Sequence, residues 1–418
     1  MIEHRILVFF LLAIFCTTSF SMDLDAKLSL IKNVYQLEPK NCDSNSFHEI
    51  SQEELLAGKV LFESVSLSGD RDISCKTCHL DKFASTDGLP IAVGVGGQGE
   101  GKDRLYNDNG TLVQRNVLSL KGRANPKFTA YFWDGKVQVE KNRIVTQFGD
   151  EINGKFTSPL SLASILPLVE RDEFLGKTNP LFANDIQYRV GNKLYYHRYV
   201  AISEALQKRF LNPSTEEDRK VSKALKSANV PLEQMELSHI GELMAKFISS
   251  KFKCETSAWD KYLSGIKSAI TDKQKNGAIL FYGKGRCASC HSGQFFSDFQ
   301  YYSIGAPQGE FGPHSRHRDI GRAGVTNRVE DLYLFRTPPL TDVSHTAPYG
   351  HNGAFDNLED VVVHHFNPLE FYINHKDYYD SDYFLISKFI DARDDILSTI
   401  DIKNKEELEQ LLDFLTTL

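Results

Sequence analysis

Two short stretches of the chain have the residue types and the spacing that attach a c-type haem. The first is Cys75-Lys76-Thr77-Cys78-His79, and the second is Cys287-Ala288-Ser289-Cys290-His291. In a C-x-x-C-H pattern the two thiols bond to the porphyrin vinyl groups, and the adjacent histidine is a proximal ligand of the iron. The two copies predict two covalently bound haem c groups, with His79 and His291 as iron ligands.

A pair of cysteines at this spacing can also be a redox dithiol or half of a zinc site. A zinc site needs two such pairs that converge on one ion, and a thioredoxin-like dithiol needs a strand-helix-strand context. The sequence indicates neither context, and neither alternative accounts for a histidine directly after both pairs. Haem attachment is therefore the favoured interpretation.

A helix is predicted ahead of each motif, so the chain repeats one structural unit. Ser51 with Glu54, and Thr271 with Gln274, have the spacing of capping boxes that begin these helices. Each helix then continues with a glycine and an apolar run, at residues 58–62 and 277–281. This duplication predicts two related haem-binding units in one chain.

The composition supports an ordinary globular protein. The chain has 418 residues, of which 41% are hydrophobic, and this is enough for two domains with their own cores. Its net charge is −7 and it has no long basic run, which argues against a nucleic-acid partner. Strand patterns are few, so the predicted fold class is mainly α.

The N-terminus has the pattern of an export signal. His4 and Arg5 precede an apolar run at residues 6–15, and residues 19–21 include small side chains where a signal peptidase would cut. We expect residues 1–21 to be a signal peptide removed before Met22, because the run is too short to span a membrane comfortably. The mature protein is then expected in the periplasm, where bacterial haem c is attached, without a membrane anchor.

Two cysteines remain after the haem motifs and the signal peptide are set aside. These are Cys42 and Cys254. In an oxidising compartment they are candidates for one disulfide, which is the favoured interpretation, and two buried free thiols are the alternative.

Several further motifs resemble the bacterial di-haem cytochrome c peroxidase family, which includes the MauG-type oxidases. The resemblance extends from Gly58 to Pro368. Its most specific parts, besides the haem motifs, are Gln114-Arg115-Asn116, Phe132-Trp133-Asp134-Gly135, Thr346-Ala347-Pro348-Tyr349-Gly350-His351-Asn352-Gly353 and Leu358-Glu359. It implies two cytochrome c-like haem domains packed against each other. We expect residues 22–260, including an N-terminal arm, to form the peroxidatic domain and residues 261–418 to form the electron-transfer domain.

The resemblance also implies an activity. In this family the N-terminal haem reduces hydrogen peroxide to water, and the C-terminal haem receives electrons from a small cytochrome c or a cupredoxin. Homodimers are usual in the family. Two alternatives stay open: a MauG-like oxidase that acts on a partner protein, and a non-catalytic di-haem electron carrier or redox sensor.

The family spacing suggests a second ligand for one iron only. It places the distal ligand of the C-terminal haem fourteen residues after His351, which is His365 in this chain. His364 is the rival, and only one of the two can face the iron because neighbouring side chains on a helix diverge. No histidine lies between His79 and His197, so the N-terminal iron is expected to keep an accessible position.

The distal side of the N-terminal haem departs from the family pattern. Gln114 matches a family glutamine and is predicted to be catalytic together with Arg115, but Arg123-Ala124 stands where the family has a distal glutamate. Arg123, or a glutamate from elsewhere, is the alternative acid or base. The family's electron-relay tryptophan has no counterpart before Gln114, so Tyr106 is the nearest substitute.

Two expectations concern residues around these motifs. Trp133 and Trp259 are predicted to be core residues. The family holds a calcium ion through backbone carbonyls that correspond to Thr346 and Pro348, with hard oxygen donors that suit this ion. The side-chain ligand is left open among Asp103, Asn107, Asp108 and Asn109, and a polar surface loop is the alternative for that cluster.

Overall fold

The computed structural model describes most of the chain. The described residues are 23–47, 49–104, 111–176, 184–191, 193–308, 319–374, 387 and 389–418. The expected signal peptide, Tyr106 and residues 107–109 lie outside this set.

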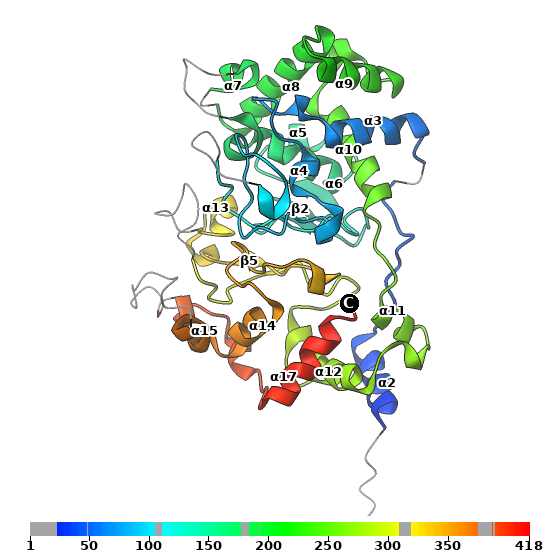
Figure 1. Cartoon of the computed structure of the whole chain (residues 1–418), viewed down its shortest axis with the longest axis vertical. Coiled ribbons are helices and arrows are strands. Elements are labelled where there is room, and N and C mark those ends of the chain that lie inside the picture. The colour runs from blue at the N-terminus through cyan, green and yellow to red at the C-terminus, as the bar shows by residue number, and fades with distance from the viewer. Residues whose placement is uncertain are drawn as a thin grey trace, which may run out of the picture.

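The described chain forms two mainly helical halves, which are the upper and lower parts of the molecule in Figure 1. In the N-terminal half, α10 (Leu237–Lys251) packs against α3 (Gln52–Glu63) and α6 (Pro159–Ile165). The other helices of this half are α4 (Cys75–Cys78), α5 (Asp150–Asn153), α7 (Asp185–Val190), α8 (Tyr195–Leu211) and α9 (Glu216–Ser227). A small antiparallel sheet completes it, with order β1 (Ala130–Tyr131), β2 (Val137–Glu140) and β3 (Arg143–Val145). Ala130 lies opposite Gln138, and Val139 lies opposite Ile144.

The C-terminal half is built around the pair α12 (Asp272–Tyr282) and α17 (Lys405–Leu415). Its other helices are α11 (Ala258–Leu263), α13 (Ala323–Thr326), α14 (Leu358–Phe366) and α15 (Pro368–Asn374). Strands β4 (Tyr301–Tyr302) and β5 (Phe335–Arg336) pair in antiparallel. The predicted mainly α class agrees with this architecture.

The helix that precedes each haem motif begins and packs in the same way in both halves. The capping boxes at Ser51 and Thr271 are both present, as predicted. A Cβ atom on Gly58 would overlap the carbonyl oxygen of Leu243 in α10, and one on Gly277 would overlap that of Gln410 in α17. Glycine therefore allows each of these helices to approach its partner closely.

The N-terminal arm lies on the C-terminal half, which differs from the expected domain division. Figure 1 shows α2 (Leu24–Tyr35) beside α12 at the bottom of the molecule, and the chain then runs up to α3. Leu28 is buried in the same core as Trp259. Lys40 pairs with buried Asp260 at 3.3 Å. The apolar face of α2 thus completes the C-terminal core, which the order of residues along the chain does not reveal.

A disulfide joins this arm to the segment between the halves. Cys42 and Cys254 are bonded at 2.03 Å, so the favoured pairing is present. A few residues later, Ser46 donates from its backbone to the Ala124 carbonyl of the N-terminal half at 2.9 Å. The arm therefore connects both halves.

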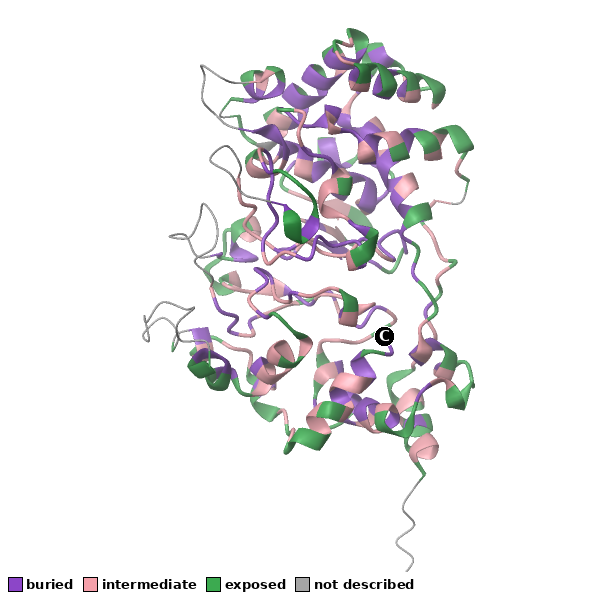
Figure 2. Ribbon diagram, in the orientation of Figure 1, coloured by how far each residue is buried: buried purple, intermediate pink, exposed green. Residues whose placement is uncertain are grey.

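The buried residues form one large core in the N-terminal half and smaller ones in the C-terminal half (Figure 2). Among the described residues, no helix is long and apolar enough to cross a membrane.

Candidate functional site

Each half contains a cavity bordered by one of the two haem motifs. The N-terminal cavity has a volume of about 400 Å³, and Cys75, Cys78 and His79 lie in its wall. The C-terminal cavity has a volume of about 250 Å³, with Cys287, Cys290 and His291 in its mainly apolar wall. Pockets of this kind suit a large, flat, mostly apolar cofactor.

The histidines of the two motifs are oriented alike. Nδ1 of His79 lies 2.8 Å from the Ser85 carbonyl oxygen, and Nδ1 of His291 lies 2.9 Å from the Phe296 carbonyl oxygen. A bond of this kind fixes the ring and leaves Nε2 available to a metal. Burial lowers the pKa of both histidines to about 4, so both are neutral and able to ligate.

The four motif cysteines form no disulfide, and they line the cavities. Burial raises the pKa of Cys75 and Cys287 to about 12, so neither is a reactive thiolate at neutral pH. No group of three or more His, Cys, Asp or Glu in the described ranges has the arrangement of a metal site. Each thiol pair lies beside a cavity and a motif histidine, which is the arrangement that haem attachment requires.

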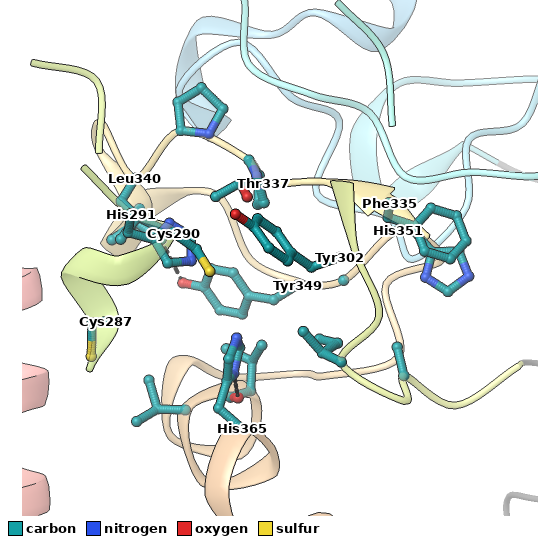
Figure 3. A pocket seen from close by; sticks show the side chains of 18 of the residues that line it. Cys287, Cys290, His291, Tyr302, Phe335, Thr337, Leu340, Tyr349, His351 and His365 are labelled. Atoms are coloured by element: carbon teal, nitrogen blue, oxygen red, sulfur yellow. Dashed lines mark hydrogen bonds between the residues drawn. The ribbon is translucent and has the colours of Figure 1, made fainter. Parts of the chain in front are cut away.

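Of the two neighbouring histidines in α14, only His365 borders the C-terminal cavity. Figure 3 shows His365 and His291 on different walls of this cavity. Nδ1 of His365 lies 2.6 Å from the Val361 carbonyl oxygen, which leaves Nε2 unused. His364 is fully buried, and its Nε2 lies 3.0 Å from the Ile304 carbonyl oxygen. The helix therefore directs the two side chains to different surroundings, as helix geometry requires.

The N-terminal cavity differs because His79 is the one histidine among its described lining residues. Gln114 and Leu118 both line it, so the predicted glutamine lies at this cavity. The described wall of the N-terminal cavity therefore has a single imidazole group.

Glu173, which the sequence did not single out, lines the same cavity. It lies in a single π-helical turn, η5 (Arg171–Leu175). Burial raises the pKa of its carboxyl group to about 7, although the charge of Lys136 partly opposes the shift. A carboxyl group with this pKa exchanges a proton near neutral pH. No spacing relative to a motif marks it, since the turn is far from either motif along the chain.

Arg115 also borders this cavity, but its guanidinium group is held by two carboxylates. It bonds to Asp134 at 2.5 Å and to Asp319 at 2.6 and 2.8 Å. Burial would raise the pKa of Asp319, but the charge and hydrogen bonds of Arg115 outweigh this effect and lower it to about 2. These ion pairs join the two halves, and they hold the guanidinium group of Arg115 in place.

Trp133 borders both cavities, whereas the sequence predicted only a core residue. Its side chain is buried, and Nε1 donates to the Asn116 carbonyl oxygen at 3.0 Å. Trp259 is a core residue as predicted, because it stacks on Tyr262 in the C-terminal core and lines neither cavity.

One of the two carbonyl groups expected to hold calcium, that of Pro348, lies beside Asn116. The Asn116 side chain donates to the Pro348 carbonyl oxygen at 2.7 Å. Thr346 and Pro348 both border the C-terminal cavity. Asp103 is in a short helical turn, η3 (Gly101–Asp103), and Asn107, Asp108 and Asn109 lie outside the described residues. Asn116 is therefore an amide in contact with one expected calcium ligand, and the sequence did not single it out for that role.

The chain is similar in sequence to known proteins of one family. The family model described as di-haem cytochrome c peroxidase matches residues 52–268, which is more than half of the chain. Cytochrome-c peroxidase IdrP1 of Pseudomonas sp. (strain SCT) is 26% identical over 335 residues, covering 75% of this chain and 71% of its own length. Methylamine utilization protein MauG of Methylorubrum extorquens is 25% identical over 336 residues, with 78% and 72% covered.

Solved structures have the same fold. The diheme peroxidase BthA from Burkholderia thailandensis E264 matches with a TM-score of 0.58 and 19% identity, covering 89% of this chain and 87% of that one. A MauG-like protein associated with microbial copper homeostasis matches with a TM-score of 0.56 and 20% identity, covering 92% and 93%. Given the family model and the full-length likeness of fold, the chain belongs to the di-haem cytochrome c peroxidase family.

Proposed function

We propose that this protein is a periplasmic di-haem peroxidase that reduces hydrogen peroxide to water with electrons from a small cytochrome c or a cupredoxin. Membership of the family implies two haem c groups. The observation that supports the proposal most directly is the presence of two cavities, each with a thiol pair and a neutral histidine in its wall.

The motif residues would hold the two haems. Cys75 and Cys78 would attach the first and Cys287 and Cys290 the second, with His79 and His291 as proximal ligands. His365 would be the second ligand in the C-terminal cavity. When bound, the haems would supply one iron that takes up peroxide and one that passes electrons.

The asymmetry between the cavities supports this division of labour. A site with two protein ligands is closed and suits electron transfer, whereas a site with one ligand is open to a small oxidant. The described wall of the C-terminal cavity has His291 and His365, besides His351, whose ring stacks on Phe335, and that of the N-terminal cavity has His79.

Glu173 is the group best suited to move a proton in the N-terminal cavity. Its carboxylate would accept a proton from bound peroxide and return it to the departing oxygen, and Gln114 would orient the peroxide by hydrogen bonding. Arg115 would act as a positioning residue, because its guanidinium group is already bound by Asp134 and Asp319. This revises the role expected for Arg115.

Trp133 is proposed as the aromatic group on the electron path between the haems. It borders both cavities and is fixed by its bond to Asn116. Trp259 lies away from both cavities and is the natural control.

We also propose a calcium ion near Asn116, with the carbonyl oxygens of Thr346 and Pro348 as ligands. The amide oxygen of Asn116 would add a third hard-oxygen donor if its side chain amide were flipped. The domain division would fall before α11, with the arm belonging to the C-terminal domain, because Leu28 and Trp259 share a core.

Haem counting and turnover test the proposal together. The purified exported protein should carry two haems per chain, and it should oxidise a reduced small cytochrome when peroxide is added. One haem per chain, or peroxide that changes neither haem spectrum, would contradict the proposal.

A MauG-like oxidase is the second candidate. The open N-terminal site and the likeness to MauG favour it. In that case peroxide would alter both haem spectra, but a reduced small cytochrome would be consumed only slowly. Rapid, repeated consumption of that donor would instead support the peroxidase.

A further inference from the structure

Two buried arginines lie together at the C-terminal cavity. Arg336 is 0% exposed and Arg123 is 7% exposed, and both line this cavity. Their guanidinium groups are 5.8 and 5.6 Å from the centre of one ring, that of Phe128. The two positive charges are therefore neighbours in the interior.

Neither arginine has a carboxylate partner among the described residues. Arg336 donates to the carbonyl oxygens of Phe132 at 2.8 Å and Thr337 at 3.2 Å, and its buried Nη2 has no hydrogen-bond partner. Arg123 donates from Nε to the Ser119 carbonyl oxygen at 2.6 Å. The carboxylate whose charge acts on Arg336 is that of Asp134, and Arg115 and the Lys136 backbone already occupy its oxygens.

Other buried arginines are satisfied. Arg104 bonds to three backbone carbonyl groups, Arg322 bonds to the carbonyl oxygens of Asp134 and Gly135 and to the Gln138 side chain, and Arg209 pairs with Asp185. The pair at the cavity thus differs from the rest.

Such a pair is costly unless an anion joins it. Burial of an uncompensated charge is unfavourable, and the two guanidinium groups also repel each other. Burial lowers the pKa of Arg123 to about 10 and that of Arg336 to about 9, which reflects the missing counter-charge. Arginine nevertheless stays charged in proteins, so the arrangement favours a carboxylate that approaches from the cavity.

We propose that Arg123 and Arg336 form a carboxylate-binding site for the propionate groups of the haem in the C-terminal cavity, and that Arg123 also serves the haem in the N-terminal cavity. The second part follows because Arg123 lines both cavities, whereas Arg336 lines only the C-terminal one. The inference rests on the proposed function, since it takes the two cavities to hold haem.

The site has an electrochemical consequence. A fixed positive charge near a haem disfavours the more positive, oxidised iron and raises the reduction potential. Removing the Arg336 charge should therefore lower the potential of the C-terminal haem alone. Removing the Arg123 charge should lower the potentials of both haems.

Spectroelectrochemical titration of the haem-loaded protein tests this pattern. Arg336→Gln should lower one midpoint potential, Arg123→Gln should lower two, and Arg336→Lys should keep most of the wild-type value. Arg322→Gln is the matched control, because Arg322 is buried but lines neither cavity, and both of its potentials should match the wild type. Unchanged potentials in Arg336→Gln and Arg336→Lys, or a single change in Arg123→Gln, would overturn the assignment.

Two further measurements separate this inference from its rivals. Inorganic phosphate added to the wild type should leave both potentials unchanged if covalently held propionates fill the site, and a phosphate-dependent shift would show an exchangeable anion instead. Haem counting tests the proposed function independently of the arginine site. Two haems per chain with unaltered potentials in the variants would reject the arginine site alone.

Discussion

At the scale of single residues, the choice between His365 and His364 decides the state of the C-terminal haem. His365→Ala should convert this haem from low spin to high spin, because the second ligand is lost. His364→Ala should keep the low-spin spectrum but destabilise the fold by about 1–3 kcal/mol, since it removes a buried group bonded to the Ile304 carbonyl oxygen. Electron paramagnetic resonance and thermal unfolding of both variants check the prediction. The opposite spin states would reverse the assignment.

Glu173 should govern the pH dependence of peroxide turnover. Its pKa of about 7 means that the carboxylate, which is the form able to accept a proton, is lost as the pH falls below 7. The wild-type kcat/KM for peroxide should therefore decrease on the acid side. Glu173→Gln should lower kcat/KM by about 10²-fold or more and remove this acid limb.

Glu170→Gln is the control for Glu173. Glu170 pairs with Lys136 at 3.2 Å and its charge raises the pKa of Glu173. Its neutralisation should move the acid limb to lower pH without abolishing it. Identical pH profiles in the wild type and in Glu173→Gln would exclude Glu173 as the proton-transferring group.

The sequence predicts site residues whose spacing is fixed by covalent chemistry, and it misses those that only the fold brings near. In each motif the two cysteines and the histidine must lie within five residues to hold a porphyrin, so both motifs are visible in the sequence. Glu173 and Trp133 reach the cavity through a π-helical turn and a loop after β1. Nothing local distinguishes such residues from ordinary surface or core residues.

At the scale of elements, the close approach of α3 to α10 and of α12 to α17 should depend on glycine. Gly58→Ala and Gly277→Ala would each push a Cβ atom into a backbone carbonyl of the partner helix, and a backbone cannot move aside like a flexible side chain. Each change should destabilise its half by about 1–3 kcal/mol or more. Urea unfolding followed by circular dichroism measures the loss.

Lys59→Ala is the matched control for these glycine variants, because Lys59 is exposed on the same helix as Gly58. It should unfold at the wild-type urea concentration. Wild-type stability in Gly58→Ala would mean that the two helices are not held at this contact.

Helix starts are well predicted here because capping is local. The side chains of Ser51 and Thr271 accept the backbone N–H three residues later, as expected, and Asn357 does the same at the start of α14. The placement of α2 could not be predicted in the same way. An apolar helix face does not specify which core it packs against. Only the tertiary structure shows that α2 packs on the C-terminal core.

At the scale of the whole molecule, two sets of contacts hold the two halves together. One is the arm with its disulfide between Cys42 and Cys254, which links residues 212 positions apart. The other is Arg115, which bonds to Asp134 in the N-terminal half and to Asp319 in the C-terminal half. Arg115 and Asp134 line the N-terminal cavity and Trp133 borders both cavities, so the distance between the haems depends on this junction.

Arg115→Leu should weaken the contact between the two halves. Removal of the cation leaves two buried carboxylates unpaired, which typically costs about 3–5 kcal/mol of the free energy of unfolding.

The ion pair should also make the stability of the wild type depend on pH. Asp319 has a pKa of about 2 in the folded protein, below its ordinary value, so its contribution to the free energy of unfolding is present above pH 4 and is lost as the pH falls toward 2. Wild-type stability should fall over this interval by about 2 kcal/mol more than that of Asp319→Asn. Arg328→Gln, which breaks an exposed pair with Glu330, should behave like the wild type at every pH. Equal acid sensitivity in the wild type and in Asp319→Asn would show that the arginine bridge does not hold the halves together.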